Sequence, residues 1–395
     1  MNSCNCKICG SEIEKIISLG LQPMANKYPA SKEYFSKEVL ADMDIFFCDE
    51  CLYAHLPCSI DRSLFFEDYY YLSSVNKELK NHFNEFAKKI TKDKYNFVVD
   101  VGSNDGILLE PLQENGISCL GVDPSENVSK LANEKGLETL VGFFDMSIAK
   151  KIKNQYGSPD LICASSVFTH LENPADFFNV ADYLLEDKGS IIIEVEYLKD
   201  IVETFGFERF YFDRPHYYSL ESLKKLAYVY NFHLVDVENI DAHGGSIRVT
   251  FSRVLSNKNL KKINNILSDE LTALSRNSIL QKFFEFEKYC LVLKQSISEM
   301  HSKRLAVAGY GCPARFSTIT NFAKIDSTMI PFVIDDSPLK EEKFSPGMHI
   351  PIKKFADSPL ADAYIVFAYE YINSIKQKFN ESNIVFYRPI PFLEL

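Results

Sequence analysis

Four cysteines stand in two closely spaced pairs near the start of the sequence. Cys6 and Cys9 form one C-x-x-C motif, and Cys48 and Cys51 form a second. Each motif presents two thiolates from one turn, and two such turns supply the four ligands of a tetrahedral zinc site. Because the protein supplies all four ligands, the pattern predicts a structural zinc ion. Two alternatives stay open: Cys4 and Cys58 as substitute ligands, and thiols that are buried but unconnected.

A second group of reactive side chains lies in residues 210–219, with the sequence FYFDRPHYYS. The imidazole of His216 titrates in the range that suits a general base. Arg214 keeps its proton at any ordinary pH, so its expected role is to bind an anion. In an extended segment Arg214 and His216 would share one face. A surface loop is the alternative interpretation of this stretch.

Composition and charge limit the classes of partner. The chain has 395 residues, which indicates two to three domains, and a net charge of −11, which argues against nucleic acid as a partner. The sequence has no apolar run long enough to span a membrane and no secretion signal at its start. We therefore expect a cytoplasmic protein whose ten cysteines are thiols or metal ligands. The oligomeric state is open, with a monomer slightly favoured.

The stretch NFVVDVGSNDGILLEPL, residues 96–112, predicts a buried strand, a tight turn and a helix. Gly102 and Gly106 bracket the turn and allow the backbone to approach a ligand. The next strand, SCLGVD, ends at Asp123, where a carboxylate can accept the two hydroxyls of a ribose. His170 follows the fourth strand, PDLICASS, at the edge where parallel sheets place ligand groups.

Two further strands, FHLVDVENI and GSIRVTFSRV, follow the fifth, GSIIIEVE, and are joined by the short turn DAHGG. A short turn implies an antiparallel pair. A doubly wound parallel sheet that ends in such a pair is the layout of class I methyltransferases that use S-adenosylmethionine. Another nucleotide-binding Rossmann domain is the alternative.

A second α/β segment follows residues 257–303, whose patterning predicts connecting helices. RLAVAGYGCPARFSTI predicts a strand, a G-x-G-x-x-A turn and a helix, with Pro313 at its first position. Asp335 closes the next strand at the spacing of a dinucleotide site. Free N–H groups at this helix start attract phosphate, but a packing turn without ligand is equally compatible.

Taken in order, seven motifs resemble those of three-domain sugar C-methyltransferases that act on nucleotide-linked deoxysugars. They are the cysteine pairs, YYYLSS, DVGSNDG, SSVFTHLENP, AHGGSIRV, GYGCPAR and DDSPLKEEKFSPGMHIPI. The resemblance implies a zinc-binding module at 1–75, a methyltransferase domain at 76–255, and a helical connector with a Rossmann-like domain at 256–395. It also implies that a proton leaves the sugar carbon beside a keto group, and that the enolate takes the methyl group of S-adenosylmethionine.

The catalytic motif departs from the family pattern. The family usually carries Tyr-His-Glu-His where this chain has Tyr211, Phe212, Asp213 and Arg214. Tyr211 is kept and would polarise the carbonyl group, and the favoured base, the second histidine, is missing. We expect His170 or His216 to be the base, with Asp213 next, and Arg214 to bind an anionic group. Methylation of oxygen or nitrogen, or binding of the nucleotide sugar without turnover, are the alternatives.

The remaining expected contacts are of two kinds. The expected cofactor-binding residues are Gly102, Ser103, Asn104, Asp105, Gly106, Asp123, Pro124, Phe144 and Ser165. The expected substrate-binding residues are Tyr69, Tyr71, Ser73, His243, Gly244, Tyr310, Gly311 and Arg315. For Tyr69 and Tyr71 a role in the core is as well supported as substrate contact.

Overall fold

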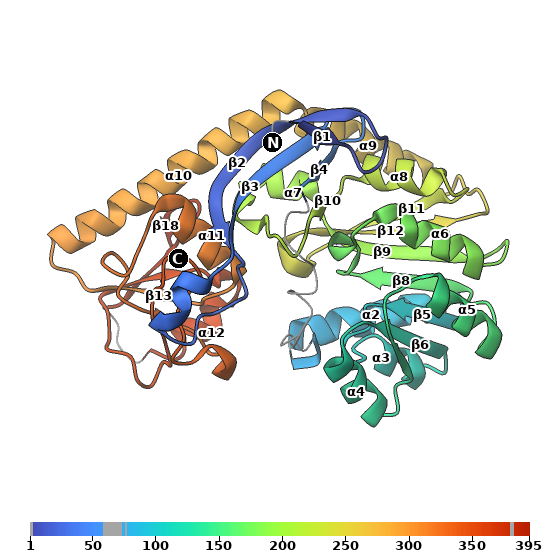
Figure 1. Cartoon of the computed structure of the whole chain (residues 1–395), viewed down its shortest axis with the longest axis horizontal. Helices are drawn as coiled ribbons and strands as arrows, with labels where there is room; N and C mark the ends of the chain where they lie inside the picture. The colour runs from blue at the N-terminus through green and yellow to red at the C-terminus, as the bar shows by residue number, and fades with distance from the viewer. Residues whose placement is uncertain (1–2, 58–72, 76, 380–382) are drawn as a thin grey trace. The chain divides into compact units, whose positions relative to one another are not determined.

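The structure is a computed structural model that describes residues 3–57, 73–75, 77–379 and 383–395. The chain forms two compact units, and both draw on separate stretches of sequence (Figure 1). The first contains residues 1–14, 47–200 and 213–275, and the second contains residues 15–46, 201–212 and 276–395. The division into three domains by residue range stays a prediction. Within the described residues, no helix is long and apolar enough to cross a membrane.

A seven-stranded sheet forms the centre of the first unit, in the order β11-β12-β9-β8-β5-β6-β7 (Figure 1). The five parallel strands are β5 (Phe97–Val101), β6 (Ser118–Asp123), β7 (Thr139–Val141), β8 (Leu161–Ser165) and β9 (Ser190–Glu196). The predicted antiparallel pair is confirmed as β11 (His233–Ile240) and β12 (Ser246–Ser252). The five parallel strands are mostly buried, which explains why they read as largely apolar segments, whereas β11 at the edge is mostly half-buried.

Helices cover both faces of this sheet. On one face, α2 places Phe86 and Ile90, and α3 places Leu112, in a cluster with Val98 of β5. On the other, Phe178 of α6 meets aromatic rings of the antiparallel edge. The helices of this unit are α2 (Lys77–Lys92), α3 (Leu109–Glu114), α4 (Glu126–Glu134), α5 (Met146–Gln155), α6 (Pro174–Leu184), α8 (Leu220–Tyr228) and α9 (Leu260–Ala273).

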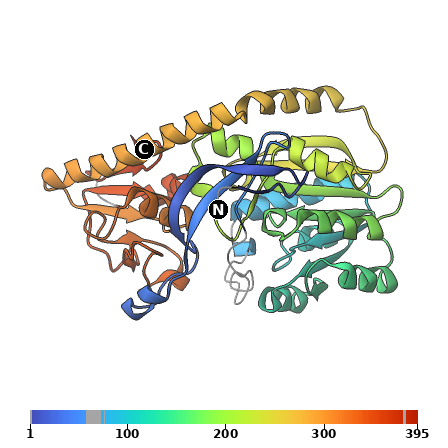
Figure 2. The same ribbon diagram turned by 45° about the horizontal axis from the view of Figure 1, so that its top comes forward.

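Short strands frame the cysteine pairs. β1 (Ser3–Asn5) pairs with the start of β2 (Glu12–Pro23), and β4 (Tyr53–His55) pairs antiparallel with β10 (His216–Tyr217). The interval between the two cysteine motifs is mostly a long hairpin of β2 and β3 (Leu40–Cys48) (Figure 2). Residues 15–46 of this hairpin belong to the second unit, so the two cysteine motifs meet although their connecting segment folds elsewhere.

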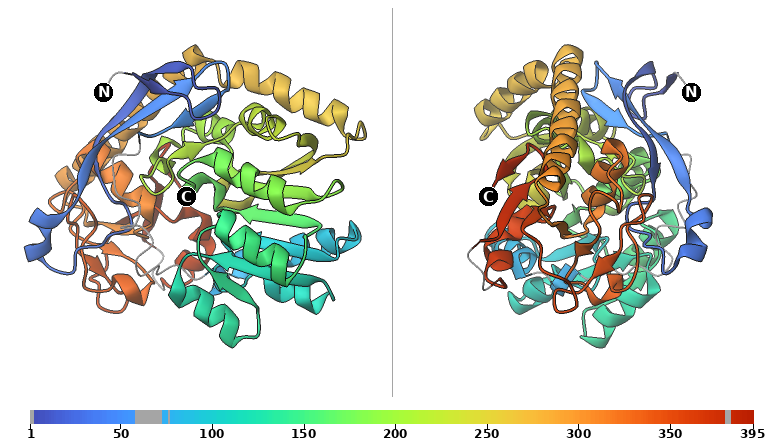
Figure 3. Two further views of the ribbon diagram at one scale, coloured as in Figure 1. Left: turned by 45° about the vertical axis from the view of Figure 1, so that its right-hand side comes forward. Right: turned by 90° about the vertical axis from the view of Figure 1, so that its left-hand side faces the viewer.

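The second unit is a Rossmann-like α/β fold, as predicted. Its six-stranded sheet has the order β15-β14-β13-β16-β17-β18, and only β18 runs antiparallel to its neighbour. The strands are β13 (Val307–Tyr310), β14 (Val333–Ile334), β15 (Ile352–Lys353), β16 (Ala363–Val366), β17 (Val385–Arg388) and β18 (Leu393–Glu394). The helices are α10 (Arg276–Ser302), α11 (Ala314–Ala323) and α12 (Ile372–Lys376), and α10 is the long helix beside this sheet in Figure 3.

Two local details refine the sequence prediction. The chain passes between the units within α7 (Leu198–Glu203). Pro313 is the N-cap of α11 and not its first helical residue, with an extended ψ of 175°. The prediction of Pro313 at the first helical position is therefore wrong by one residue. Because proline has no N–H, the first helical N–H group belongs to Ala314.

Candidate functional site

The paired cysteines come together as a metal-binding cluster. The Sγ atoms of Cys6, Cys9, Cys48 and Cys51 all lie within 4.8 Å of one another, and those of Cys9 and Cys48 are 3.7 Å apart. Tetrahedral zinc with bonds of about 2.3 Å to sulfur requires sulfur–sulfur distances of about 3.8 Å. The residues present therefore fit a structural zinc ion.

The pKa values of these thiols depend on the neighbouring thiols and on burial. A hydrogen bond from Cys51 lowers the pKa of Cys6 to about 5, whereas burial raises the pKa of Cys48 to about 11. A divalent cation would supply the positive charge that several close thiolates need. Cys4 lies outside the cluster, with its Sγ atom 3.7 Å from Nε2 of His55, and Cys58 lies outside the described residues.

The turn after β5 has the backbone that the sequence predicts. Gly102 and Gly106 have φ angles of +73° and +87°, which favour glycine. A Cβ atom on Gly102 would lie 2.7 Å from Val167, and one on Gly106 would lie 2.4 Å from Leu137. Both glycines therefore serve close packing as well as the bend of the turn.

Asp123 anchors this turn at the end of β6. Its Oδ2 atom accepts a hydrogen bond from the backbone N–H of Asn104 at 2.9 Å, and its Oδ1 atom accepts one from Ser125 at 2.9 Å. Burial raises the pKa of Asp123, although these two hydrogen bonds oppose the change. Each carboxylate oxygen can accept more than one hydrogen bond, so Asp123 keeps capacity for ribose hydroxyls.

Other polar groups suit S-adenosylmethionine at the same edge, where β5, β6 and β8 end. The hydroxyl oxygens of Ser103 and Ser165 are buried and have no hydrogen-bond partner among the described residues. Asn104 accepts from the backbone of Ser73 at 3.1 Å, while Asp105 accepts from Ser74. These groups fit the polar amino-acid and ribose parts of the cofactor.

The other expected ligand residues of this unit are placed as follows. Pro124 is half-buried beside Asp123, and Phe144 packs its ring 5.3 Å from that of Phe177. Gly244 lies in the turn between β11 and β12, with His243 beside it in the chain. Tyr69 and Tyr71 lie outside the described residues, so their roles stay predictions.

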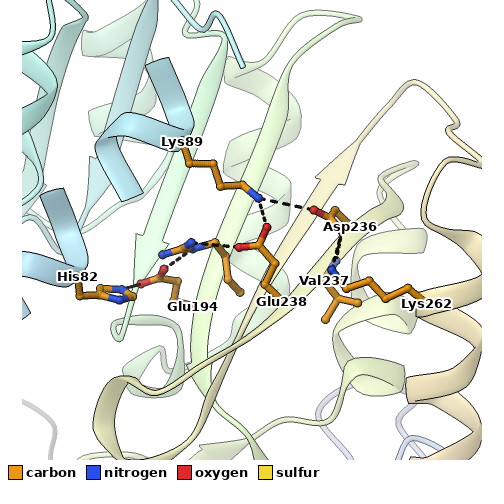
Figure 4. Close-up of polar contacts among 8 residues, drawn as sticks. His82, Lys89, Glu194, Asp236, Val237, Glu238 and Lys262 are labelled. Carbon is orange, nitrogen blue, oxygen red and sulfur yellow. Dashed lines mark hydrogen bonds and ion pairs between the residues drawn. The ribbon is translucent and has the colours of Figure 1, made fainter. Parts of the chain in front are cut away.

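A buried ion-pair network ties α2 to the sheet (Figure 4). Glu194 of β9 contacts Nε2 of His82 at 3.0 Å and Nε of Arg248 at 2.5 Å. Arg248 also meets Glu238 at 3.2 Å, and Glu238 bonds Lys89 of α2. Burial alone would raise the pKa of Glu194, but the hydrogen bond from His82 and the charge of Arg248 outweigh it and lower the pKa. The network therefore holds α2 against the sheet. This helix begins shortly after Ser73 and Ser74, whose backbone N–H groups donate to Asn104 and Asp105 in the turn after β5.

His170 lies at the end of η3 (Phe168–His170), in the loop that follows β8, and its ring is held by the segment at 213. Its Nδ1 atom is 2.5 Å from the carbonyl oxygen of Asp213. A carbonyl oxygen only accepts, so Nδ1 carries the hydrogen and the lone pair of the neutral ring is on Nε2. The side chain is 8% exposed, which leaves a small part of it accessible.

The other charged residues of residues 210–219 are also engaged. Arg214 forms an ion pair with Glu196 at the end of β9. His216 has no exposed surface, and its Nδ1 atom bonds the hydroxyl of Tyr53. Asp213 is half-buried. The interpretation of this stretch as a surface loop is therefore wrong.

Tyr211 belongs to the second unit, where it is buried near Tyr28 and Arg315. Arg315, in the first turn of α11, forms an ion pair with Glu370 at 2.6 Å. The guanidinium groups of Arg315 and Arg388 lie 4.9 and 4.3 Å from the centre of the Tyr369 ring.

The loop after β13 is held by its own side chains. Gly311 has a φ of +81°, and a Cβ there would lie 2.6 Å from Ala368. Asp335 accepts from the backbone of Cys312 at 2.7 Å, from that of Ser337 at 3.0 Å and from Lys340 at 3.1 Å. Tyr310 donates to Asp336. Asp335 therefore stabilises the loop after β13. The distance in sequence between this loop and Asp335 was the basis for the predicted dinucleotide site.

Sequence reasoning missed several residues of these sites. Glu194 and Glu196 are buried charges within the strand GSIIIEVE, and a charge in a buried strand predicts a partner. Arg248 is a further buried charge, in strand β12, and gives the same signal. Tyr53 and Glu208 carry no local motif that would single them out.

Three family models match this chain, in the same order along the sequence as the cysteine cluster, the seven-stranded sheet and the six-stranded sheet. The sequence matches a putative zinc binding domain over residues 6–66, a methyltransferase domain over residues 71–237 and a C-methyltransferase C-terminal domain over residues 241–391. C-methyltransferase NovU of Streptomyces niveus is 26% identical over 399 residues, which cover 98% of this chain and 95% of that protein.

Two further matches cover only part of this chain. The ubiquinone biosynthesis O-methyltransferase of Acinetobacter baylyi is 25% identical over 123 residues, or 30% of this chain and 50% of that protein. The solved structure of magnesium protoporphyrin IX methyltransferase from Synechocystis covers 50% of this chain and 99% of its own, with 15% identity and a TM-score of 0.37. The protein is an S-adenosylmethionine-dependent methyltransferase with a zinc-binding cysteine cluster. The order of the three matched domains and the full-length similarity to a C-methyltransferase agree with the three-domain family that its sequence motifs resemble.

Proposed function

We propose that the protein methylates a carbon atom beside the keto group of a nucleotide-linked deoxysugar, with His170 as the general base. The observation that carries the assignment is the hydrogen bond from Nδ1 of His170 to the carbonyl oxygen of Asp213. It fixes the tautomer whose basic lone pair is on Nε2, on a loop at the carboxyl edge of the sheet.

The reaction begins when Nε2 of His170 accepts the proton from the sugar carbon. The C–H electron pair forms the carbon–carbon double bond of an enolate, whose oxygen takes the negative charge. Arg214, held at this edge by Glu196, is the proposed counter-charge for that oxygen or for another anionic group. When bound, S-adenosylmethionine would supply the electrophilic methyl group to this carbon, and its sulfur would keep the electron pair of the broken S–CH3 bond as S-adenosylhomocysteine.

His216 is the weaker candidate for the base. It has no exposed surface, and its ring bonds the buried hydroxyl of Tyr53. A general base must come within hydrogen-bond reach of the proton that it removes. The complete burial of His216, in β10 beside β4, therefore supports His170 over His216.

The second unit separately carries side chains of the kind that binds phosphate. In the second unit, Nε of Arg388 is buried and has no hydrogen-bond partner among the described residues, while Nη1 of Arg315 forms an ion pair with Glu370. One carboxylate oxygen of Glu208 is also buried without a hydrogen-bond partner among the described residues. The positive charges of Arg315 and Arg388 act on this carboxylate. The two guanidinium groups support binding of a phosphate group in the second unit, because guanidinium groups match phosphate oxygens; the carboxylate of Glu208 acts as their counter-charge and does not bind phosphate.

A matched pair of variants tests the base. Asparagine at either position keeps an amide that can replace Nδ1 but has no basic nitrogen. With a panel of nucleotide-linked keto-deoxysugars, His170→Asn should lower kcat by about 10²–10⁴-fold, and His216→Asn should lower it only a few-fold. Mass spectrometry and NMR of the product should locate the new methyl group on carbon. If His170→Asn keeps its kcat, or if the methyl group is on oxygen or nitrogen, the proposal fails.

A further inference from the structure

We infer that Tyr53, the second residue after the zinc ligand Cys51, is a positioning residue for His170. The inference rests on the proposed role of His170 as the base. Tyr53 itself is buried against His216 and Tyr218 and is assigned no contact with substrate. Its expected role is to hold the groups that orient the imidazole ring.

The first route from Tyr53 to His170 runs through the backbone. β4 and β10 form a short ladder in which His55 faces His216, and the N–H of Leu56 donates to the carbonyl oxygen of Pro215 at 2.9 Å. The hydroxyl of Tyr53 bonds Nδ1 of His216 within this ladder. The ladder therefore fixes the chain immediately after Asp213, whose carbonyl oxygen holds Nδ1 of His170.

The second route is a column of aromatic rings. The ring centre of Tyr53 lies 5.5 Å from that of Tyr218, and Tyr218 lies 5.1 Å from Phe168. The hydroxyl of Tyr218 also contacts the carbonyl oxygen of Phe168 at 3.5 Å. Phe168 begins the short helix that ends at His170, so the column of rings packs against the start of that helix.

The turn that contains Cys51 also contacts the carboxyl end of the 213–219 segment. Ser219 directs its hydroxyl to the carbonyl oxygen of Cys51 at 3.4 Å, and Lys225 bonds that of Glu50. The segment that carries Asp213 is thus attached to the cysteine turn on one side and to β4 on the other. A general base displaced by about 1 Å can lose up to 10²-fold in rate, so these attachments should matter for the chemistry.

The test replaces Tyr53 by phenylalanine, which removes only the hydroxyl group. We expect kcat to fall by about tenfold, the size of one lost hydrogen bond, while zinc content and the affinity for S-adenosylmethionine stay unchanged. The Tyr95→Phe control removes a hydroxyl bonded to Ser190 near the amino end of β5, and it should leave kcat unchanged. A purely structural role for Tyr53 would change stability without touching kcat at saturating substrate.

A second readout does not depend on turnover. NMR of ¹⁵N-labelled histidine reports the tautomer of His170, whose signal is identified by its loss in His170→Asn. Tyr53→Phe should weaken the Nδ1–H signature of His170, and Tyr95→Phe should leave it intact. If Tyr53→Phe does not retain zinc, Tyr218→Phe, which removes the hydroxyl that contacts the carbonyl oxygen of Phe168, is examined with the same readout and the same expectation.

The outcomes separate the two proposals. A wild-type kcat in His170→Asn would reject the proposal that His170 is the general base. It would also reject any catalytic role for Tyr53 that acts through His170. A large loss in His170→Asn, together with unchanged kcat and unchanged His170 signal in Tyr53→Phe, would overturn the positioning role alone. The double variant Tyr53→Phe/His216→Asn should lose little more kcat than the more damaging of its two single variants, because the residues act as a pair. Fully additive losses would contradict the first route.

Discussion

Replacing Asp123 by asparagine separates the cofactor-binding role of this carboxylate from its structural role. Asparagine keeps the shape of the side chain and one oxygen acceptor, but it loses the charge. The carboxylate already accepts one backbone N–H on each oxygen, from Asn104 and Ser125. The ribose hydroxyls would therefore bond to the remaining lone pairs, and the variant should lose at least one such hydrogen bond.

The expected loss follows from the strength of a hydrogen bond to a charged acceptor. One such bond contributes about 1.5–3 kcal/mol. The Kd for S-adenosylmethionine should therefore rise by about 10- to 150-fold, with a smaller effect on kcat at saturating cofactor. Isothermal titration calorimetry with S-adenosylmethionine and S-adenosylhomocysteine measures this change directly, because both carry the same ribose.

Asp160 provides a matched control. Its carboxylate also accepts two backbone N–H groups, from Asn96 at 2.8 Å and Phe97 at 3.2 Å, but it lies at the amino end of the sheet. Asp160→Asn should lower thermal stability without changing the Kd. An unchanged Kd in Asp123→Asn, or an equal loss of affinity in Asp160→Asn, would refute the assignment of Asp123 to the ribose.

Three further predictions concern the metal, the buried ion pairs and the anion site. Cys51→Ser should lose most of the zinc that metal analysis finds in the wild type and should unfold more easily, because binding of a structural metal contributes directly to folding; a fully zinc-loaded variant of wild-type stability would contradict this. Glu194→Gln should lower the unfolding free energy by about 3–5 kcal/mol at neutral pH, because Arg248 and His82 lose their buried partner. The folded pKa of Glu194 is lowered, so its stabilisation is complete above the unfolded pKa of about 4.3, declines below it and is lost as the pH falls through the folded value; a gap between the two proteins that does not shrink as the pH is lowered below about 4 in urea titrations would argue against the ion pairs. Arg214→Lys should mainly raise the KM of the sugar substrate, since lysine lacks the planar fork, and a loss confined to kcat would instead indicate a role only in the transition state.

Local patterns were sufficient to predict the individual pieces of the fold. The apolar runs predicted the parallel strands, the glycine-bracketed turn was confirmed between β5 and α3, and DAHGG correctly indicated the antiparallel pair of β11 and β12. The cysteine spacing likewise predicted a four-sulfur cluster. Each of these signals lies within a few residues, or repeats with a regular period, so that a single sequence is enough to detect it.

The parts that were missed depend on contacts between distant residues. His170 is held by a backbone carbonyl 43 positions away, and the identity of Asp213 plays no part in that bond. Tyr53 and His216 are 163 positions apart, and no local pattern connects them. The hairpin of β2 and β3 also folds into a different unit from the cysteines that flank it. Such arrangements follow from tertiary packing, which spacing and periodicity do not report.

The central claim is that His170 removes a proton from a sugar carbon before methyl transfer. Incubation of a nucleotide-linked keto-deoxysugar with the enzyme in D₂O, without methyl donor, tests this step alone. The wild type and the Asp160→Asn control should place deuterium on the carbon beside the keto group, as read by NMR, and His170→Asn should not. Methyl transfer by the wild type with no deuterium at that carbon, or full exchange in His170→Asn, would contradict the account.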